Sequence, residues 1–569
     1  MIPPLRSRSR TVRPVTFLRT ARFRFAALAC GLALGTGAAL GGEAGTEPGS
    51  ELGAVPEAIR AHGATVPAHE VAIEVHEATI ANLQQAIFDG RATCTQIVQA
   101  YLDRIEAYDK PLGLGAITEV NPRVLAQADS LDRALAAGEA PGPLFCAPLL
   151  VKDNFDTHDL PTTAGSVALA GFIPPEDATM VRLLREAGAL VLAKTNMAEW
   201  AFSPRQSISS SYGTTVNAYA FDRTPAGSSG GTASGVAASL GVAGLGSDTG
   251  NSIRGPSSHL ALVGIRSTLG LTSRAGVIPL AFDRDVAGPM TRTVEDAARI
   301  FTVIAGEDER DPYTQVVRGR ELPDYTTFLD RDGLRGTRIG VLEAFADPER
   351  GDPEVLAIFE GALSELEAAG ATVVRGFQIP DRETLMQGNL FCRRFRYDMG
   401  QYLASLGSAA PFTDVVEVLE SGLFGPDVEA GLQRFQEGPL DIHPGREDPP
   451  CPDFREHPGR QRLLDAVVRA MDAEGIDAMV FPSWTHPPAP LDRANEEYRG
   501  DNSQGLIPAT GLPAITVPMG FLADGLPTGL QIVGRPFDDG LLFRYAYAYE
   551  QATGHRRPPG LFPPLTAQP

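Results

Sequence analysis

One lysine and two serines in this chain have the residue types and surroundings that nucleophilic attack on a carbonyl requires. Lys152 directly follows an apolar run at residues 144–151, and Ser228 and Ser252 lie in glycine-rich segments further along the chain. Attack on an amide carbonyl needs a nucleophile, a base that takes its proton, and donors for the oxyanion. A serine hydroxyl can supply the nucleophile. Lysine can act as the base only when it is neutral, because its ordinary pKa is about 10.4.

The elements around these residues would have to position them. The uninterrupted apolar run at residues 144–151 predicts a buried strand. Such a strand would deliver Lys152 to its carboxyl end, where open α/β sheets place their sites. Burial at that point would lower the pKa of the lysine. Gly250 allows a tight turn that exposes backbone N–H groups, which suit a developing oxyanion.

The motifs around the three residues resemble those of the amidase signature family of hydrolases. They are VKDN at residues 151–154, GSSGG at 227–231 and GSDTGNSIR at 246–254. The spacing of the two serines also matches the family pattern. Further matching fragments, such as PTTAGS at 161–166 and GLPTGLQ at 525–531, extend the resemblance over roughly residues 79 to 555.

This resemblance implies a Ser-Ser-Lys triad that needs no metal ion and no organic cofactor. Ser252 would be the nucleophile, Lys152 the base, and Ser228 the bridge that passes the proton between them. In the family, the bridging serine is preceded by a cis peptide bond. The N–H groups of Thr249, Gly250, Asn251 and Ser252 itself would form the oxyanion hole.

Residues next to the triad would orient it, and one of them departs from the family. We expect Ser229, Asp248 and Arg254 to orient the triad residues without contacting the substrate. Asp248 and Arg254 carry opposite charges on either side of the nucleophile in the sequence. Many members have a second glycine where this chain has Asn251. The backbone N–H survives that change, but the side chain could narrow the pocket or bind substrate.

A rival interpretation makes Ser229 the nucleophile. Residues 227–231 also satisfy G-x-S-x-G, the nucleophile elbow of α/β-hydrolases, which requires a later histidine. An elbow should follow a buried strand, but residues 221–225 are polar and end in proline. The same segment has the composition of a flexible linker, although an alanine-rich helical pattern follows it directly.

Helical and strand-like segments alternate along most of the chain. Helical patterns near residues 79–108, 178–187 and 538–552 are interspersed with strand-like segments such as 189–193 and 529–533. This order predicts an α/β fold, a central mixed β-sheet covered by helices on both faces. We expect a single domain over residues 71–560. Residues 378–460 fit a variable insertion that forms a wall of the substrate pocket, or ordinary helical core.

The N-terminus differs in composition from the rest of the chain. Residues 1–40 contain an arginine-rich start without acidic residues and then a short apolar block, a pattern typical of a secretory signal peptide. A transit peptide is the alternative. Residues 41–70 resemble a flexible lead-in. We therefore expect a secreted or periplasmic protein, in which Cys94, Cys146, Cys392 and Cys451 could form disulfides. For Cys146, which lies within the apolar run, we expect a small buried hydrophobic residue.

The composition of the chain favours some classes of binding partner and argues against others. A formal net charge of −21 argues against binding to nucleic acid, and a hydrophobic content of 43% supports a large core. The apolar block is short for a membrane span, so we expect no stable membrane insertion after removal of the signal peptide. A small-molecule amide is the expected partner, and a homodimer is left open.

By this resemblance the chain is expected to be an amidase that hydrolyses a carboxylic amide to an acid plus ammonia or an amine, through an acyl-enzyme. The alternative is a glutamine-dependent amidotransferase A-type subunit, which would be a glutaminase that works with partner subunits. A third possibility is a non-catalytic binding protein on the same scaffold, which the intact Lys152, Ser228 and Ser252 disfavour.

Overall fold

The computed structural model describes residues 73–565 with the exception of residue 389. The predicted signal peptide at 1–40 and lead-in at 41–70 lie outside the described residues. Across the described range, no helix combines the length and the apolar character needed to cross a membrane.

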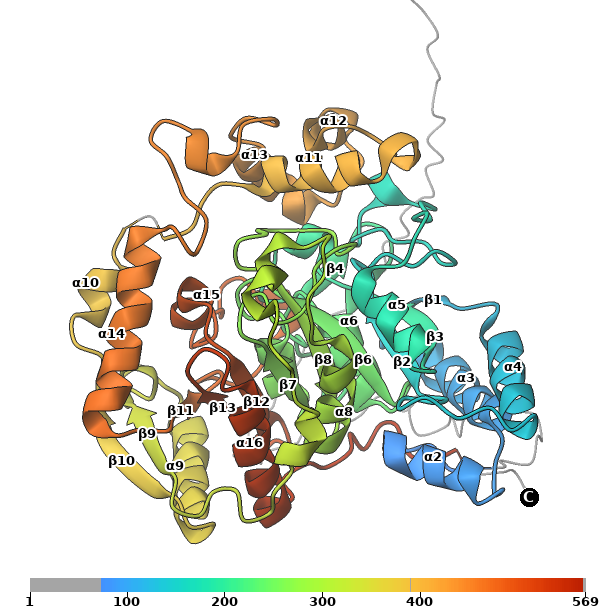
Figure 1. Cartoon of the computed structure of the whole chain (residues 1–569), viewed down its shortest axis with the longest axis horizontal. Helices are drawn as coiled ribbons and strands as arrows, with labels where there is room; N and C mark the ends of the chain where they lie inside the picture. The colour runs from blue at the N-terminus through green and yellow to red at the C-terminus, as the bar shows by residue number, and fades with distance from the viewer. Residues whose placement is uncertain (1–72, 389, 566–569) are drawn as a thin grey trace, which may run out of the picture. The chain divides into compact units, whose positions relative to one another are not determined.

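A mixed sheet of 11 strands organises the described chain, in the order β1-β3-β2-β6-β8-β7-β12-β13-β11-β9-β10. The predicted α/β class with a central mixed sheet and flanking helices is confirmed (Figure 1). The strands of this sheet are β1 (Ile117–Val120), β2 (Pro148–Lys152), β3 (Leu190–Thr195), β6 (Ala243–Asp248), β7 (Val263–Arg266), β8 (Val286–Thr291), β9 (Arg338–Leu342), β10 (Thr372–Phe377), β11 (Ala478–Pro482), β12 (Ala514–Phe521) and β13 (Pro527–Val533). A separate hairpin is formed by β4 (Ser207–Ser209) and β5 (Gly213–Thr215).

The strands in the middle of the sheet are buried, which accounts for the apolar runs in the sequence. Strand β2 pairs in parallel with both β3 and β6, while β6 pairs antiparallel with β8. Every residue of β2, β3, β6 and β8 is buried. Strands that are covered on both faces read as continuous hydrophobic segments rather than alternating ones.

Helices flank the sheet, as Figure 1 shows. They are α2 (Ile80–Phe88), α3 (Cys94–Leu112), α4 (Val124–Ala136), α5 (Thr179–Glu186), α6 (Gly230–Ala237), α7 (Arg254–His259), α8 (Val294–Ile304), α9 (Pro353–Ala368), α14 (Pro458–Glu474), α15 (Leu506–Thr510) and α16 (Asp539–Thr553). Helix α6 packs on β2 and β6, whereas α8 packs on β8 and contacts α5 and α16.

The predicted helical region at residues 79–108 consists of two helices. Helix α2 ends before Gly90, whose φ of 70° lies in the left-handed region that favours glycine. Helix α3 then begins at a capping box, in which Thr93 accepts a hydrogen bond from the Gln96 N–H. It ends at Gly113, a left-handed C-cap.

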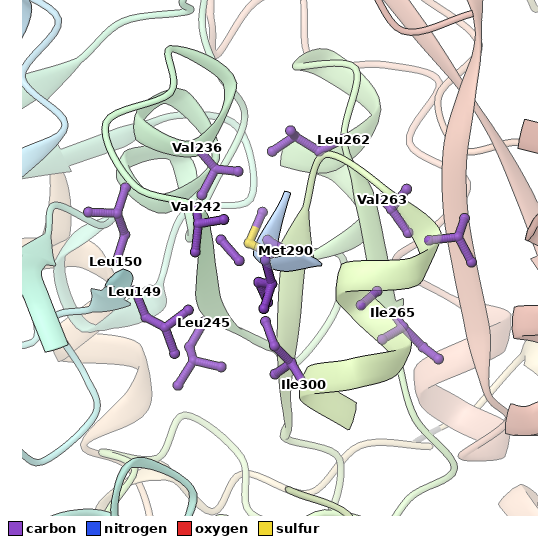
Figure 2. Close-up of a cluster of buried hydrophobic side chains, with 14 of the residues drawn as sticks. Leu149, Leu150, Val236, Val242, Leu245, Leu262, Val263, Ile265, Met290 and Ile300 are labelled. Carbon is purple, nitrogen blue, oxygen red and sulfur yellow. The ribbon is translucent and has the colours of Figure 1, made fainter. Parts of the chain in front are cut away.

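A cluster of apolar side chains fixes the relative placement of the central elements (Figure 2). Leu150 of β2, Val236 of α6 and Leu245 of β6 are each fully buried within it. Helix α6 approaches β2 closely at Gly235, where an added Cβ would lie 2.8 Å from the Leu150 side chain. Full burial of one such side chain contributes about 1.5–3 kcal/mol. The cluster therefore holds together β2, which ends at Lys152, α6, which begins just after Ser228, and β6, which precedes the turn of Ser252.

Two disulfides link the described cysteines. Cys94 at the start of α3 is bonded to Cys146, and Cys392 is bonded to Cys451. The interpretation of Cys146 as only a small buried hydrophobic residue is therefore wrong, although the residue is buried. The apolar run at 144–151 is also not wholly a strand, because residues 143–146 form a turn and β2 begins at Pro148.

Residues 378–460 form a group of short helices. They are α10 (Arg382–Met386), α11 (Phe395–Ser405), α12 (Val415–Ser421) and α13 (Glu429–Phe435). In Figure 1, α11, α12 and α13 lie together at the top of the view. The Cys392–Cys451 disulfide joins the two ends of the segment that contains these three helices.

Candidate active site

Lys152 occupies the position that the sequence predicts for it. It is the last residue of β2 and is fully buried. Its Nζ lies 2.7 Å from Ser228 Oγ and 2.9 Å from Ser247 Oγ. Ser247 Oγ also accepts a hydrogen bond of 3.0 Å from the Asn154 side-chain amide. The lysine therefore has two serine hydroxyls within hydrogen-bond distance, where the sequence predicts one.

Burial is the main influence on the ionisation of this lysine. It lowers the pKa of Lys152, and the carboxylates of Asp248 and Asp285 oppose it only partly, so that the pKa falls to about 7. A neutral lysine has one lone pair and two N–H bonds. If an N–H donates to Ser247, the lone pair can accept the Ser228 hydroxyl proton. The geometry suits a general base that works near neutral pH.

Ser228 lies just before α6 and is fully buried. The peptide bond between Gly227 and Ser228 is cis. The glycines that surround Ser228 are required by close packing. An added Cβ at Gly231 would collide with the backbone of Asn196, and one at Gly227 with that of Ser203. The GSSGG motif is thus a tightly packed start of a helix and not a linker.

Ser252 lies in the turn between β6 and α7, and is 5% exposed. Among the hydrogen bonds of residues 73–565, none uses its hydroxyl, and none uses the N–H groups of residues 249–252 as donors. The loop thus offers consecutive unused backbone donors next to a serine hydroxyl, an arrangement that suits an oxyanion. The structure brings Lys152 and Ser228 into direct contact, and it shows no hydrogen bond between Ser228 and Ser252.

The loop is held by an aspartate between two arginines. Asp248 accepts hydrogen bonds from Arg254 Nε at 3.1 Å and Arg266 Nη1 at 2.9 Å, and all three side chains are buried. Burial alone would raise the pKa of Asp248, but the two guanidinium groups outweigh it and lower the pKa to about 2. Arg254 also donates to the Gly250 carbonyl oxygen at 2.5 Å. Arg254 thus connects Asp248 to the turn of the loop.

A second carboxylate anchors the start of the loop. Thr249 Oγ1 donates a hydrogen bond of 2.6 Å to Asp285, which also accepts from the N–H groups of Leu280 and Ala281. Ser229, at the N-cap of α6, donates to the Ser247 carbonyl oxygen at 3.2 Å. Asp248, Arg254 and Ser229 are therefore all buried and bonded at the sides of the candidate site.

The side chain of Asn251 is bound to another part of the chain. Its amide donates to Asp501 Oδ2 at 2.9 Å and to the Pro204 carbonyl oxygen at 3.3 Å. Asp501 also accepts from the Tyr498 hydroxyl at 2.8 Å. Burial raises the pKa of Asp501 to about 6. An added Cβ at Gly250 would collide with the Gln504 side chain. The segment around residues 498–504 thus borders the oxyanion loop.

Sequence reasoning missed Ser247, Asp501 and Gln504. Ser247 lies within the motif that contains Asp248, so its place in that motif was an available signal. The segment that carries Asp501 and Gln504 has no recognisable motif, and it lies about 250 residues from Asn251 in the chain.

Within residues 73–565, no histidine is hydrogen-bonded to Ser229, although the nucleophile-elbow interpretation would require one. His259 packs against Trp484 with ring centroids 4.5 Å apart and the rings tilted by 42°, and burial lowers the pKa of His259 to about 3. Elsewhere in the described chain, His158, Asp159 and Asp177 form a group with metal-ligand side chains. Arg185 pairs with both of those aspartates, at 2.6 and 3.2 Å, so a cation already offsets one of their two negative charges.

A cavity of about 630 Å³ is lined partly by residues 378–460. Tyr397, Tyr402 and His443 line it from that segment, and Asp156 and Phe282 line it as well. Neither Lys152 nor either candidate serine lines it. Residues of the 378–460 segment thus line a cavity that neither Lys152 nor Ser228 borders, and the predicted wall of the substrate pocket stays a prediction.

The comparisons with known proteins agree on one family. The family model described as Amidase matches residues 96–543. The A subunit of the glutamyl-tRNA(Gln) amidotransferase of Thermosynechococcus vestitus is 35% identical over 483 residues, which cover 82% of this chain and 97% of that protein.

Solved structures are similar over a comparable span. The native peptide amidase from Stenotrophomonas maltophilia is 36% identical with a TM-score of 0.75, and the match covers 85% of this chain and 99% of that one. The A subunit of the glutamyl-tRNA(Gln) amidotransferase from Thermotoga maritima is 27% identical with a TM-score of 0.65, covering 87% and 99%.

Proposed function

Because this chain belongs to the amidase signature family and is an enzyme that hydrolyses carbon–nitrogen bonds, we propose that Ser252 attacks a carboxylic amide with Lys152 as the base and Ser228 as the bridge. The observation that carries this assignment is the buried Lys152–Ser228 pair, 2.7 Å apart, next to a loop of unused backbone N–H groups.

The proposed route uses only groups of the chain, the substrate and water. Neutral Lys152 accepts the Ser228 proton as Ser228 accepts the Ser252 proton, and Ser252 Oγ bonds to the amide carbon. The carbonyl oxygen takes the negative charge and accepts hydrogen bonds from the N–H groups at residues 249–252. Collapse breaks the carbon–nitrogen bond as the proton returns to the leaving ammonia or amine. Water then hydrolyses the acyl-Ser252 ester by the same proton path.

The comparison with curated proteins supports the alternative, a glutamine-dependent amidotransferase A-type subunit, better than it supports a general amidase. The glutamyl-tRNA(Gln) amidotransferase A subunits match at 33–35% identity and are covered over 94–99% of their length. In this form, the amide would be that of glutamine, and the ammonia would be used with partner subunits. We therefore propose glutaminase-type hydrolysis as the first substrate to test.

A stand-alone peptide amidase is the second candidate, and specific observations favour it. The structure of the peptide amidase has a higher TM-score, 0.75, than that of the amidotransferase subunit from Thermotoga maritima, 0.65. The two disulfides are typical of secreted and periplasmic proteins. They support the proposal that residues 1–40 direct export, which an amidotransferase subunit would not need.

One experiment separates these candidates. Purified protein would first be labelled with a fluorophosphonate to locate the reactive serine by mass spectrometry. Ammonia release would then be measured from glutamine and from peptide amides, each with and without co-expressed amidotransferase partner subunits. Glutamine hydrolysis that depends on the partners would establish the first candidate. Hydrolysis of peptide amides by the chain alone would establish the second, and no label and no hydrolysis would refute both.

A further inference from the structure

The cavity beside α11 contains a buried acid whose bonding is incomplete. Asp156 lines this cavity of about 630 Å³ and is only 4% exposed. One of its carboxyl oxygens accepts a hydrogen bond of 2.8 Å from the Tyr402 hydroxyl. Its other oxygen has no hydrogen-bond partner within residues 73–565. The volume lies within the range of pockets that enclose small-molecule ligands.

The buried cations of the cavity wall are bound to other acids. Arg274 pairs with Asp311 at 2.7 Å, and Arg394 pairs with Asp398 at 2.6 Å. Arg310, at the exposed rim, lies 3.5 Å from Glu176. Burial raises the pKa of Asp156 to about 7, although Tyr402, Lys194 and Arg310 act in the opposite direction. A carboxylate buried without an ion pair is costly, and a bound cation would offset that cost.

Aromatic residues line the same cavity as Asp156, namely Phe282, Tyr397 and Tyr402. Aromatic faces attract cations and provide apolar contact area for a ligand body. Because the Arg274 guanidinium already lies over the Phe282 ring, 3.9 Å from its centroid, the tyrosine rings are the faces left for a ligand. We propose that this cavity binds an arylalkyl ammonium ligand, whose charged nitrogen pairs with Asp156 and whose apolar body lies against Tyr397 and Tyr402. The site is distinct from the Lys152–Ser228 pair, so the proposal does not depend on the proposed function.

Calorimetry with the full-length protein tests the proposal without a variant. 2-Phenylethylamine and its neutral analogue 2-phenylethanol would be titrated separately, each before and after the reactive serine is blocked with a fluorophosphonate. We expect the amine to bind with one-to-one stoichiometry and roughly tenfold or more tighter than the alcohol, because only the amine forms the charge-assisted bond. Equal affinities, or amine binding that disappears when the serine is blocked, would overturn the proposal.

Two variants then locate the binding. Asp156→Asn should weaken amine binding by roughly tenfold or more and leave alcohol binding unchanged. Glu176→Gln is the matched control, because Glu176 lines the same cavity but its side chain is 76% exposed. It should change amine affinity by less than about twofold, since exposed pairs contribute little. Equal losses in the two variants would show general attraction to the rim and not a site at Asp156.

Discussion

The Nζ of Lys152 and the hydroxyl oxygen of Ser228 lie 2.7 Å apart, and both residues are inaccessible to solvent. A charged ammonium at this position would have lost its hydration, whereas a neutral amine can accept the serine proton. This pair and the loop that borders it determine how the enzyme should respond to substitution and to pH.

Replacement of the candidate nucleophile should abolish the reaction. Ser252→Ala is expected to lower turnover by a factor on the order of 10⁶, because the other hydroxyl of the loop, on Thr249, is bonded to Asp285. Ser229→Ala is the matched control, since Ser229 is buried nearby and donates only to a carbonyl oxygen. Steady-state ammonia release measures both. A covalent label found on Ser229 would instead support the nucleophile-elbow mechanism.

The rate should follow the ionisation of the lysine. Burial lowers the pKa of Lys152 to about 7, and the base works only when deprotonated, so the rate should rise with pH through about 7 and then level. Lys152→Arg should be nearly as inactive as Lys152→Ala, because a guanidinium does not deprotonate in proteins. A pH–rate profile for each protein checks this. Normal activity of Lys152→Arg at neutral pH would exclude lysine as the base.

Loss of the second serine on the lysine should affect turnover more than substrate binding. Ser247 Oγ lies 2.9 Å from Lys152 Nζ, and its removal would leave the direction of the lysine lone pair unconstrained. Ser247→Ala should lower kcat by up to about 100-fold with KM little changed, as expected for a misplaced catalytic group. Ser234→Ala, which removes another buried serine hydroxyl, should retain most activity. Equal losses in both variants would indicate general destabilisation.

The aspartate between two arginines should govern stability at low pH. The folded-state pKa of Asp248, about 2, lies below its ordinary value. Its contribution is therefore complete above about pH 4 and is lost as the pH falls toward 2. Asp248→Asn should lower the free energy of unfolding by about 3–5 kcal/mol, because it leaves buried cations without their partner.

Urea unfolding at several pH values measures this effect. Asp129→Asn provides the control, because the Asp129–Arg133 pair is exposed and should contribute less than about 1 kcal/mol. A wild-type unfolding free energy that rose on acidification from pH 4 to 2 would contradict the assignment.

Export should be visible in the mature chain. We propose that protein recovered from the culture medium or periplasm begins after Ala38, because small residues follow the apolar block there. N-terminal sequencing of the native protein measures the start point. Retention of the arginine-rich start would contradict export and would favour the amidotransferase alternative.

The sequence was sufficient for the fold class and for the position of Lys152, because both follow from local patterns. A continuous apolar run predicted β2, although the strand begins only at Pro148, after a turn in which Cys146 has a φ of 56°. A helical pattern likewise does not reveal the break at Gly90.

Contacts between distant segments could not be predicted from the sequence. Nothing near Asn251 indicates that its amide binds Asp501, and nothing near Cys94 singles out Cys146 as its partner. Several residues of 378–460 line the cavity at Asp156, and their role as a wall of the substrate pocket stays a prediction. Such pairings depend on the order of strands in the sheet, which local residue patterns do not encode.

The apolar cluster between β2, α6 and β6 has a consequence for the nascent chain. Before these elements pack, Lys152 is hydrated, and its pKa is close to the ordinary value of about 10.4, so the amine is protonated at neutral pH. Lys152 can therefore act as a base at neutral pH only after the middle of the sheet has packed and buried it. A partly folded polypeptide would thus lack the base, and activity would not return during renaturation before β2 has packed against β6.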